Sequence, residues 1–196
     1  MENAAIEVRS ASAQEVEATV ACITAAFVTD PIARFCWPSV HAHLLYMPTF
    51  TRDFGGAGFE HGTAHVSDDL CGAALWLPPG VHGNGAAVES LMRETTHPPH
   101  LDDLLGTMER MERFHPDEPH WYLPLIGVEP NAQGRGLGAA LLRHALERFD
   151  REGALAYLES SNPRNIPLYE RHGFEIVGEI RVGAAPVMTP MLRRPR

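Results

Sequence analysis

The chain has 196 residues, 44% of them hydrophobic, which are the length and composition of one globular domain. Its 16 basic residues are all arginine, and with 25 acidic residues they give a net charge of −9. The missing lysine excludes Schiff-base chemistry and a P-loop lysine, and the acidic balance argues against nucleic acid as the main partner.

Membrane insertion and secretion are not expected either. The longest apolar runs, such as residues 73–79, are far shorter than the roughly 18–20 residues that cross a bilayer. Residues 1–7 have neither the basic start nor the apolar core of a signal peptide. The cysteines, at positions 22, 36 and 71, are too widely spaced for a disulfide framework. We therefore expect a cytoplasmic protein in which Cys22 and Cys71 are buried.

The N-terminal half predicts helices and one hairpin. Residues 6–9 alternate as in a strand, and Ser12 with Glu15 predicts a capping box before an amphipathic helix that ends at Asp30-Pro31. Further elements are expected in this order: helices over 32–37 and 40–54, a glycine-rich turn at 55–58, strands over 61–66 and 70–77, and a loop over 81–100 that contains a helix over 86–93.

The C-terminal half carries stronger patterns. Apolar spacing predicts a helix over 101–114, and the apolar run over 121–128 predicts a strand buried on both faces, with Pro124 marking a bulge or a splayed edge. Next come a helix over 137–152 capped by Gly153, a strand over 154–159, a helix over 165–172, and strands over 174–182 and 186–192. This order predicts a mixed α/β sheet in a single domain that spans residues 1–196.

The strongest local signal is the turn Gln133-Gly134-Arg135-Gly136-Leu137-Gly138, between a strand and an amphipathic helix. Alternating glycines let a ligand approach the backbone, and the first turn of a helix offers unpaired N–H groups and the positive end of the helix dipole. Arg135 adds a charge in the same turn. The turn is therefore expected to bind a phosphate or a pyrophosphate.

The spacing of the glycines narrows the range of phosphate-containing ligands that this turn could bind. The dinucleotide fingerprint is G-x-G-x-x-G, whereas this turn reads G-x-G-x-G, and a P-loop needs a lysine that the chain lacks. A purely structural turn stays open as an alternative. Three glycines weaken a helix start by about 1 kcal/mol each, which favours a functional reason for them.

These residues resemble a known family. Val128 to Gly138, with the pattern Q-G-x-G-x-G from Gln133, is similar to the acyl-CoA signature of the GNAT superfamily of N-acyltransferases. Asn162 to Phe174 resembles the superfamily's Asn…Tyr-Glu-x-x-Gly-Phe stretch. The flanking residues 118–123 and 158–165 resemble the branch that includes puromycin N-acetyltransferase. The resemblance implies a GNAT-like fold, a central mixed sheet with splayed middle strands flanked by helices.

The resemblance also implies acetyl-CoA as the co-substrate and assigns roles to residues. The backbone of Gln133, Gly134, Arg135, Gly136, Leu137 and Gly138 would hold the pyrophosphate. Ile126 and Val128 would pair with the pantetheine arm, and Asn162 or Asn165 would anchor that arm by its amide. Tyr169 would protonate the departing thiolate, as a phenol can.

The sequence leaves the group that deprotonates the amine open. The candidates are Glu159 on its strand, His120 just before the buried strand, and Glu118, although charged residues near strand ends are usually solvated. A relay through water would also serve. The apolar candidates for the acceptor pocket are Phe27, Phe35, Trp37, Trp76, Met108 and Met111. The histidine pairs at 41/43, 61/65 and 97/100 lack the further ligands of a metal site, so no metal is expected.

Together these features predict an acetyl-CoA-dependent N-acetyltransferase that acetylates the primary amine of a small molecule by direct attack on the thioester. The alternative is a catalytically weak acyl-CoA-binding or sensor module on the same fold. The net charge is −7 over residues 1–100 and −2 over residues 101–196, which suits a cationic acceptor. No membrane or nucleic-acid partner is expected. A homodimer is compatible with the sequence, which leaves the oligomeric state open.

Overall fold

A seven-stranded sheet organises the chain. The computed structural model describes residues 6–196. Residues 1–5, which belong to the segment 1–7 discussed above for its lack of signal-peptide features, lie outside the described residues. The strands are β1 Val8–Ser10, β2 Ala64–Ser67, β3 Gly72–Leu77, β4 His120–Val128, β5 Leu155–Ser160, β6 Glu175–Ile176 and β7 Thr189–Arg193. Their order in the sheet is β1-β2-β3-β4-β5-β7-β6. β4 and β5 pair in parallel and the other described pairs are antiparallel, which confirms the predicted mixed sheet.

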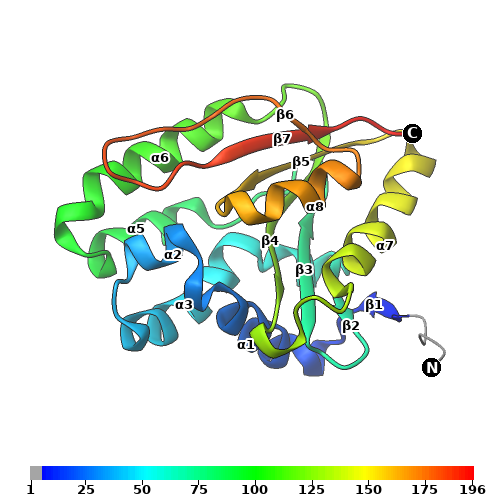
Figure 1. Cartoon of the computed structure of the whole chain (residues 1–196), viewed down its shortest axis with the longest axis horizontal. Coiled ribbons are helices and arrows are strands. Elements are labelled where there is room, and N and C mark those ends of the chain that lie inside the picture. Colours follow the sequence, from blue (N-terminus) through cyan, green and yellow to red (C-terminus); the bar gives the residue numbers. More distant parts are fainter. Residues whose placement is uncertain (1–5) are drawn as a thin grey trace.

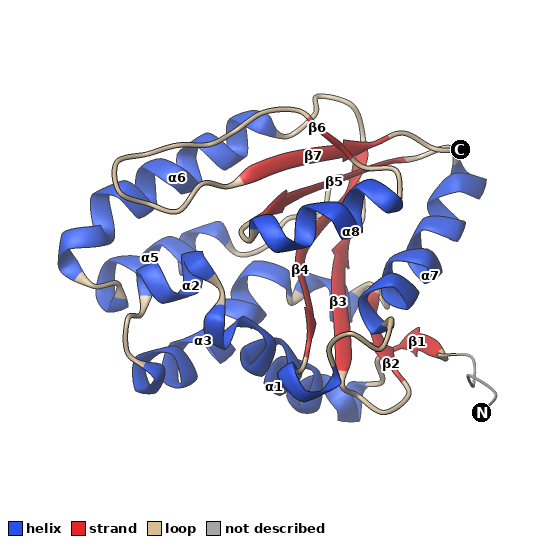
Figure 2. Cartoon of the chain, in the orientation of Figure 1, coloured by secondary structure: helices blue, strands red, loops and turns tan. Residues whose placement is uncertain are grey.

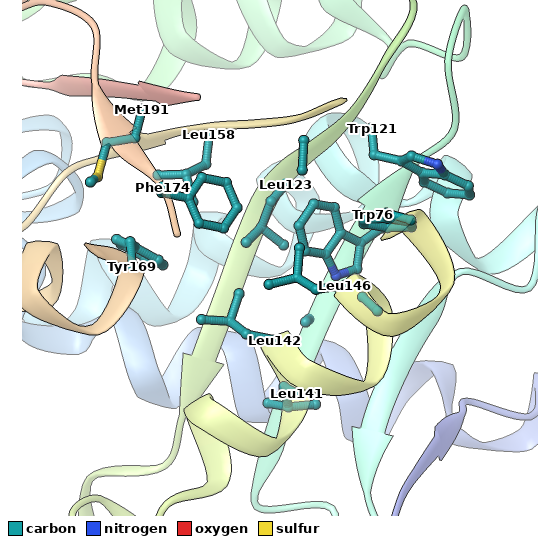
Figure 3. Packing of buried hydrophobic residues seen from close by; sticks show 14 residues of the cluster. Trp76, Trp121, Leu123, Leu141, Leu142, Leu146, Leu158, Tyr169, Phe174 and Met191 are labelled. Carbon is teal, nitrogen blue, oxygen red and sulfur yellow. The ribbon is translucent and has the colours of Figure 1, made fainter. Parts of the chain in front are cut away.

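Helices cover both faces of this sheet (Figure 1). They are α1 Val16–Ala26, α2 Pro31–Cys36, α3 Val40–Gly55, α4 Ala57–Glu60, α5 Gly85–Thr95, α6 Leu101–Phe114, α7 Leu137–Glu152 and α8 Ile166–Arg171. α7 and α8 pack on one face through a cluster that includes Trp76, Leu141 and Tyr169 (Figure 3). The helices of the N-terminal half and α6 contribute to a second cluster on the other face, which includes Ile23 and Leu75.

The helices with the clearest periodicity are confirmed residue for residue. The helices predicted over 101–114 and 137–152 are α6 and α7. Gly153 closes α7 in the left-handed conformation, with φ +63°. The predicted capping box is also present before α1, where the Glu15 carboxylate accepts a hydrogen bond from the Ser12 N–H at 2.8 Å. Neighbouring residues encode these helix bounds and caps, so they can be predicted without knowledge of the tertiary packing.

Weaker predictions need correction. The turn expected at 55–58 continues into α4, and the strand expected over 174–182 shrinks to the two exposed residues of β6, which pair only with β7 at the rim of the described sheet. Cys22 is buried as expected, whereas Cys71 is partly exposed beside the hairpin turn. Within residues 6–196, no helix is both long enough and apolar enough to cross a membrane.

A bulge at Pro124 reverses which face of the sheet the alternating side chains of β4 occupy. The register between β3 and β4 shifts between Leu75 and Leu77, because β4 carries one extra residue there. Leu123 therefore packs in the cluster with α7, whereas Leu125 packs in the cluster with α1. The predicted bulge is confirmed. The predicted burial on both faces is wrong, because buried and half-buried residues alternate along β4.

β4 and β5 diverge after three residue pairs. Their parallel pairing runs from His120 with Leu155 to Tyr122 with Tyr157. Beyond this point Pro124 has no N–H to continue the ladder, and β5 stays paired with β7 (Figure 2). The splayed middle strands implied by the resemblance are present. The edge of β4 after Tyr122 is left without β5 as a partner.

Candidate active site

A cavity of about 1540 Å³ lies where the two strands diverge. Residues of β4, β5, α6, α7 and α8 line it together with helices of the N-terminal half. The lining residues include Asp30, Met108, Glu112, His115, Tyr122, Ile126, Gly134, Gly136, Glu159, Asn162, Asn165 and Tyr169. One continuous space thus reaches the glycine-rich turn, Glu159 and Tyr169.

The glycine-rich turn has a backbone that only glycine adopts freely. Gly134 and Gly136 have φ of +76° and +89°. A Cβ added at Gly134 would meet nothing within 4 Å, so the backbone conformation and not crowding requires glycine there. α7 begins directly afterwards at Leu137, which is buried and fixes the start of the helix. The unpaired N–H groups of this first turn form a place for an anion such as the CoA pyrophosphate.

The side chains around this turn hold the backbone in place. Gln133 Nε2 donates to the carbonyl oxygen of Val128 at 3.1 Å, so that carbonyl already accepts one hydrogen bond. Ile126 lies on the same strand and lines the cavity. Arg135 is 61% exposed and lies 3.8 Å from Asp69 in the β2–β3 turn. The positive charge of Arg135 is therefore partly balanced by the carboxylate of Asp69 beside the proposed anion site.

Tyr169 lies on α8 between the cavity and the core. It is 5% exposed, and its ring meets the edge of Phe174 with ring centroids 6.1 Å apart (Figure 3). Burial first, and then the nearby charge of Asp30, raise the pKa of Tyr169. The phenol is therefore protonated at neutral pH, as a proton donor to a departing thiolate must be.

Asn162 and Asn165 both line the cavity, but they differ in their local bonds. Asn162 Oδ1 accepts a hydrogen bond from the N–H of Arg164 at 3.1 Å and caps a 3-10 turn over Pro163–Asn165. Asn165 precedes α8 and makes no capping bond to it. Of the two amides, that of Asn165 is less engaged in local structure.

Glu159 is the buried carboxyl group of the cavity. Its side chain is 1% exposed, and its Oε1 has no hydrogen-bond partner among the described residues. Burial raises the pKa of Glu159 to about 7, and the nearby hydroxyl groups of Tyr122 and Tyr157 oppose this rise only in part. A carboxyl group that titrates near neutral pH has the proton affinity of an effective general base.

His120 does not line the cavity but connects to Glu159 through His115. His115 Nε2 lies 3.6 Å from Glu159 Oε1, and His115 Nδ1 lies 3.0 Å from His120 Nε2. His120 Nδ1 lies 2.8 Å from the backbone carbonyl oxygen of Glu118, so Glu118 contributes to these contacts through its backbone and not through its carboxylate. Burial, with His120 and His82 nearby, lowers the pKa of His115 to about 4, so His115 is neutral at pH 7.

Sequence reasoning missed three residues of this site. His115 follows the last residue of α6 and Asp30 precedes α2, so both read as helix boundaries, and Tyr122 reads as one more apolar residue of β4. A boundary residue can be recognised from its neighbours in sequence, whereas its direction into a cavity depends on the packing of distant elements.

The residues predicted for the acceptor pocket lie in two kinds of place. Four of its residues line the cavity: Phe27, Trp37, Met108 and Met111. Trp76 and Phe35 do not. Trp76 is fully buried on the face that α7 covers and meets the ring of Phe149 with centroids 4.8 Å apart. Phe35 stacks on His100 with centroids 3.9 Å apart.

Four members of the histidine pairs, His43, His65, His97 and His100, have structural contacts. Throughout the described part of the chain, no three His, Cys, Asp or Glu side chains are placed to hold a metal ion. His43 Nε2 lies 2.8 Å from the carbonyl oxygen of Thr24. The ring of His65 meets that of His144, with centroids 4.6 Å apart.

Comparison with known proteins agrees with this geometry. The family described as "Acetyltransferase (GNAT) family" matches residues 100–174, which include the turn, Glu159 and Tyr169. An uncharacterized N-acetyltransferase of Schizosaccharomyces pombe is 26% identical over 83% of this chain and 71% of its own length. A mycothiol acetyltransferase of Mycolicibacterium gilvum is 44% identical over 27% of this chain, which is 20% of that protein.

Solved structures agree over nearly the whole chain. A structure described as histone acetyltransferase HPA2 and related acetyltransferase from Corynebacterium glutamicum superposes with a TM-score of 0.69, at 24% identity and 97% coverage of each chain. At this identity the likeness speaks for the fold. The family match, the relatives and the fold point the same way: residues 100–174 are similar to the GNAT family of acetyltransferases, and the whole chain has the fold of its solved members.

Proposed function

We propose that this protein transfers the acetyl group of acetyl-CoA to the primary amine of a small molecule by direct attack on the thioester. The observation that carries the proposal is the continuous cavity that joins the glycine-rich turn, protonated Tyr169 and the buried carboxyl group of Glu159. A binding or sensor module needs the turn but has no use for a buried carboxyl group that titrates near pH 7.

The chemistry follows from these positions. Glu159 takes a proton from the ammonium group of the acceptor, and the free amine attacks the thioester carbonyl carbon. A C–N bond forms and the C–S bond breaks. Tyr169 gives its proton to the departing thiolate and regains one from the nitrogen atom, which loses its second proton as the amide forms, so the products are the acetylated amine and CoA with a free thiol. The turn and the free edge of β4 hold the donor while this happens.

The proton taken by Glu159 has a route to the surface. The Glu118 carbonyl can only accept a hydrogen bond, so His120 carries its proton on Nδ1 and accepts on Nε2. His115 must then donate from Nδ1, which leaves its Nε2 free to accept from a protonated Glu159. The proton passes from Glu159 through His115 to His120 at the half-buried start of β4, where water takes it up.

Binding of acetyl-CoA, measured by calorimetry with NADH and ATP as controls, tests the donor first. Release of free thiol in the presence of amines then tests the reaction. Acetyl-CoA binding with amine-dependent thiol release supports the proposal. Binding without thiol release for any amine would favour a sensor module, and no binding by the folded protein would exclude both functions.

A further inference from the structure

One face of α6 forms a wall of the cavity and leads to the reaction centre. Leu105, Met108, Glu112 and His115 line the cavity at intervals of three, four and three residues, so they share one helical face. His115 at its end lies 3.6 Å from Glu159 Oε1, which is buried and has no hydrogen-bond partner among the described residues. This face of α6 therefore forms a wall of the cavity that leads to Glu159.

The charge of Glu112 on this face has no structural partner. No ion pair involves Glu112 within residues 6–196, whereas Glu109, one turn earlier, pairs with Arg113. Glu112 stands in the last turn of α6, where the helix dipole disfavours an acid by about 0.3–1 kcal/mol. Asp102 also lines the cavity, but it lies in the first turn of α6, where the dipole favours an acid. The helix dipole therefore accounts for an acidic residue at position 102 but not for one at position 112.

We propose that Glu112 binds a second positive charge on the acceptor, so that the substrate is a diamine or a similar amine with a second cationic group. This inference rests on the proposed function. Glu112 lies about 4.5 Å along the helix axis from His115, at 1.5 Å per residue. The two nitrogen atoms are therefore joined by a short apolar spacer, which lies against Met108 and Met111. The unpaired carboxylate of Glu112 and the carboxyl group of Glu159 hold the two ends.

A matched pair of amines tests the proposal. Thiol release is measured with pentylamine and with 1,5-diaminopentane, which differ by one terminal ammonium group. The wild-type protein should show a kcat/KM at least fivefold higher for the diamine, after correction for its two reactive ends. Glu112→Gln should reduce that preference about fivefold, which is the upper range for an exposed ion pair. The preference should also fall in high salt, because salt screens exposed charges.

Glu109→Gln is the control, because Glu109 also lines the cavity but its charge is already paired with Arg113. It should leave the preference for the diamine unchanged. Equal kcat/KM for the two amines in the wild type, or an equal loss for both amines in Glu112→Gln, would overturn the proposal while acetyl transfer stands. Acetyl-CoA binding without turnover of any amine is a different result, which overturns the proposed function and this inference with it.

Discussion

The carboxylate of Asp30 accepts a hydrogen bond of 2.5 Å from the hydroxyl group of Ser161, 131 residues later in the chain. The other oxygen of Asp30 caps α2 by accepting from the N–H groups of Ile32 and Ala33 at 3.0 and 3.1 Å. Asp30 is 7% exposed, and its charge is one cause of the raised pKa of Tyr169. One side chain therefore joins the N-terminal wall of the cavity to the segment that carries Tyr169.

Asp30→Ala should lower both stability and activity. Loss of the cap costs about 1 kcal/mol, and leaving Ser161 without its acceptor brings the total to about 2–3 kcal/mol. Urea unfolding measures this change. Ser39→Ala is the control, because Ser39 caps α3 in the same way away from Tyr169, with a bond of 3.1 Å to the N–H of Ala42. It should cost about 1 kcal/mol and leave kcat unchanged. An equal kcat in both variants would contradict a role for Asp30 at the site.

Tyr169→Phe should lower kcat about a hundredfold, because it removes the proton donor but keeps the ring that packs against Phe174. The Kd for acetyl-CoA, measured by calorimetry, should change little. A variant with wild-type kcat would remove Tyr169 from the mechanism. A variant with a greatly weakened Kd would assign Tyr169 to binding instead of proton transfer.

Glu159 should set the pH dependence of activity. Because its pKa is about 7, log kcat/KM should rise with pH up to about 7 and then level off. In Glu159→Gln this rise should disappear and the rate should fall about a hundredfold. A pH profile of thiol release measures both effects. A profile unchanged by the substitution would mean that another group or a water relay takes the proton.

The same carboxyl group links stability to pH. Its pKa is raised on folding from 4.5 to about 7, so the folded protein binds the proton more tightly than the unfolded chain. The stabilisation by the protonated form is complete below pH 4.5 and is lost as pH rises through 7, a change on the order of 3 kcal/mol. Urea unfolding of wild type and Glu159→Gln at pH 5 and pH 8 checks the sign. The variant should gain relative stability at pH 8, and the opposite trend would contradict the burial of Glu159.

Gly134→Ala should weaken acetyl-CoA binding. An alanine at φ +76° costs about 1–2 kcal/mol, and its methyl group enters the space where an anion meets the turn. Gly153→Ala is a matched control at the other end of α7, with φ +63° and, as at Gly134, nothing within 4 Å of an added Cβ. Both variants should lose similar stability in urea unfolding. Only Gly134→Ala should raise the Kd for acetyl-CoA, and an equal Kd in both would leave the turn with a structural role alone.

The sequence by itself determined the features that neighbouring residues encode. The bounds of α6 and α7 follow from the spacing of apolar residues, and the turn before α7 follows from glycines that adopt positive φ. Pro124 predicted the bulge and the divergence of β4 from β5, because proline lacks the N–H group that the hydrogen-bond ladder between two strands requires. Together these signals and the two motifs sufficed for the fold and for the resemblance to the GNAT superfamily.

Tertiary structure alone decided which side chains meet. His115 and Asp30 read as helix boundaries until packing directs one toward Glu159 and the other toward Ser161. The pKa of Glu159 rises because residues distant in sequence exclude water from it, and no local pattern reports that exclusion. Conformational preferences act over a few residues, whereas burial and electrostatic contacts depend on the whole fold. The sequence therefore pointed to the turn and left Glu159 as one of several candidates for the base, and only the structure brought Glu159 and His115 together.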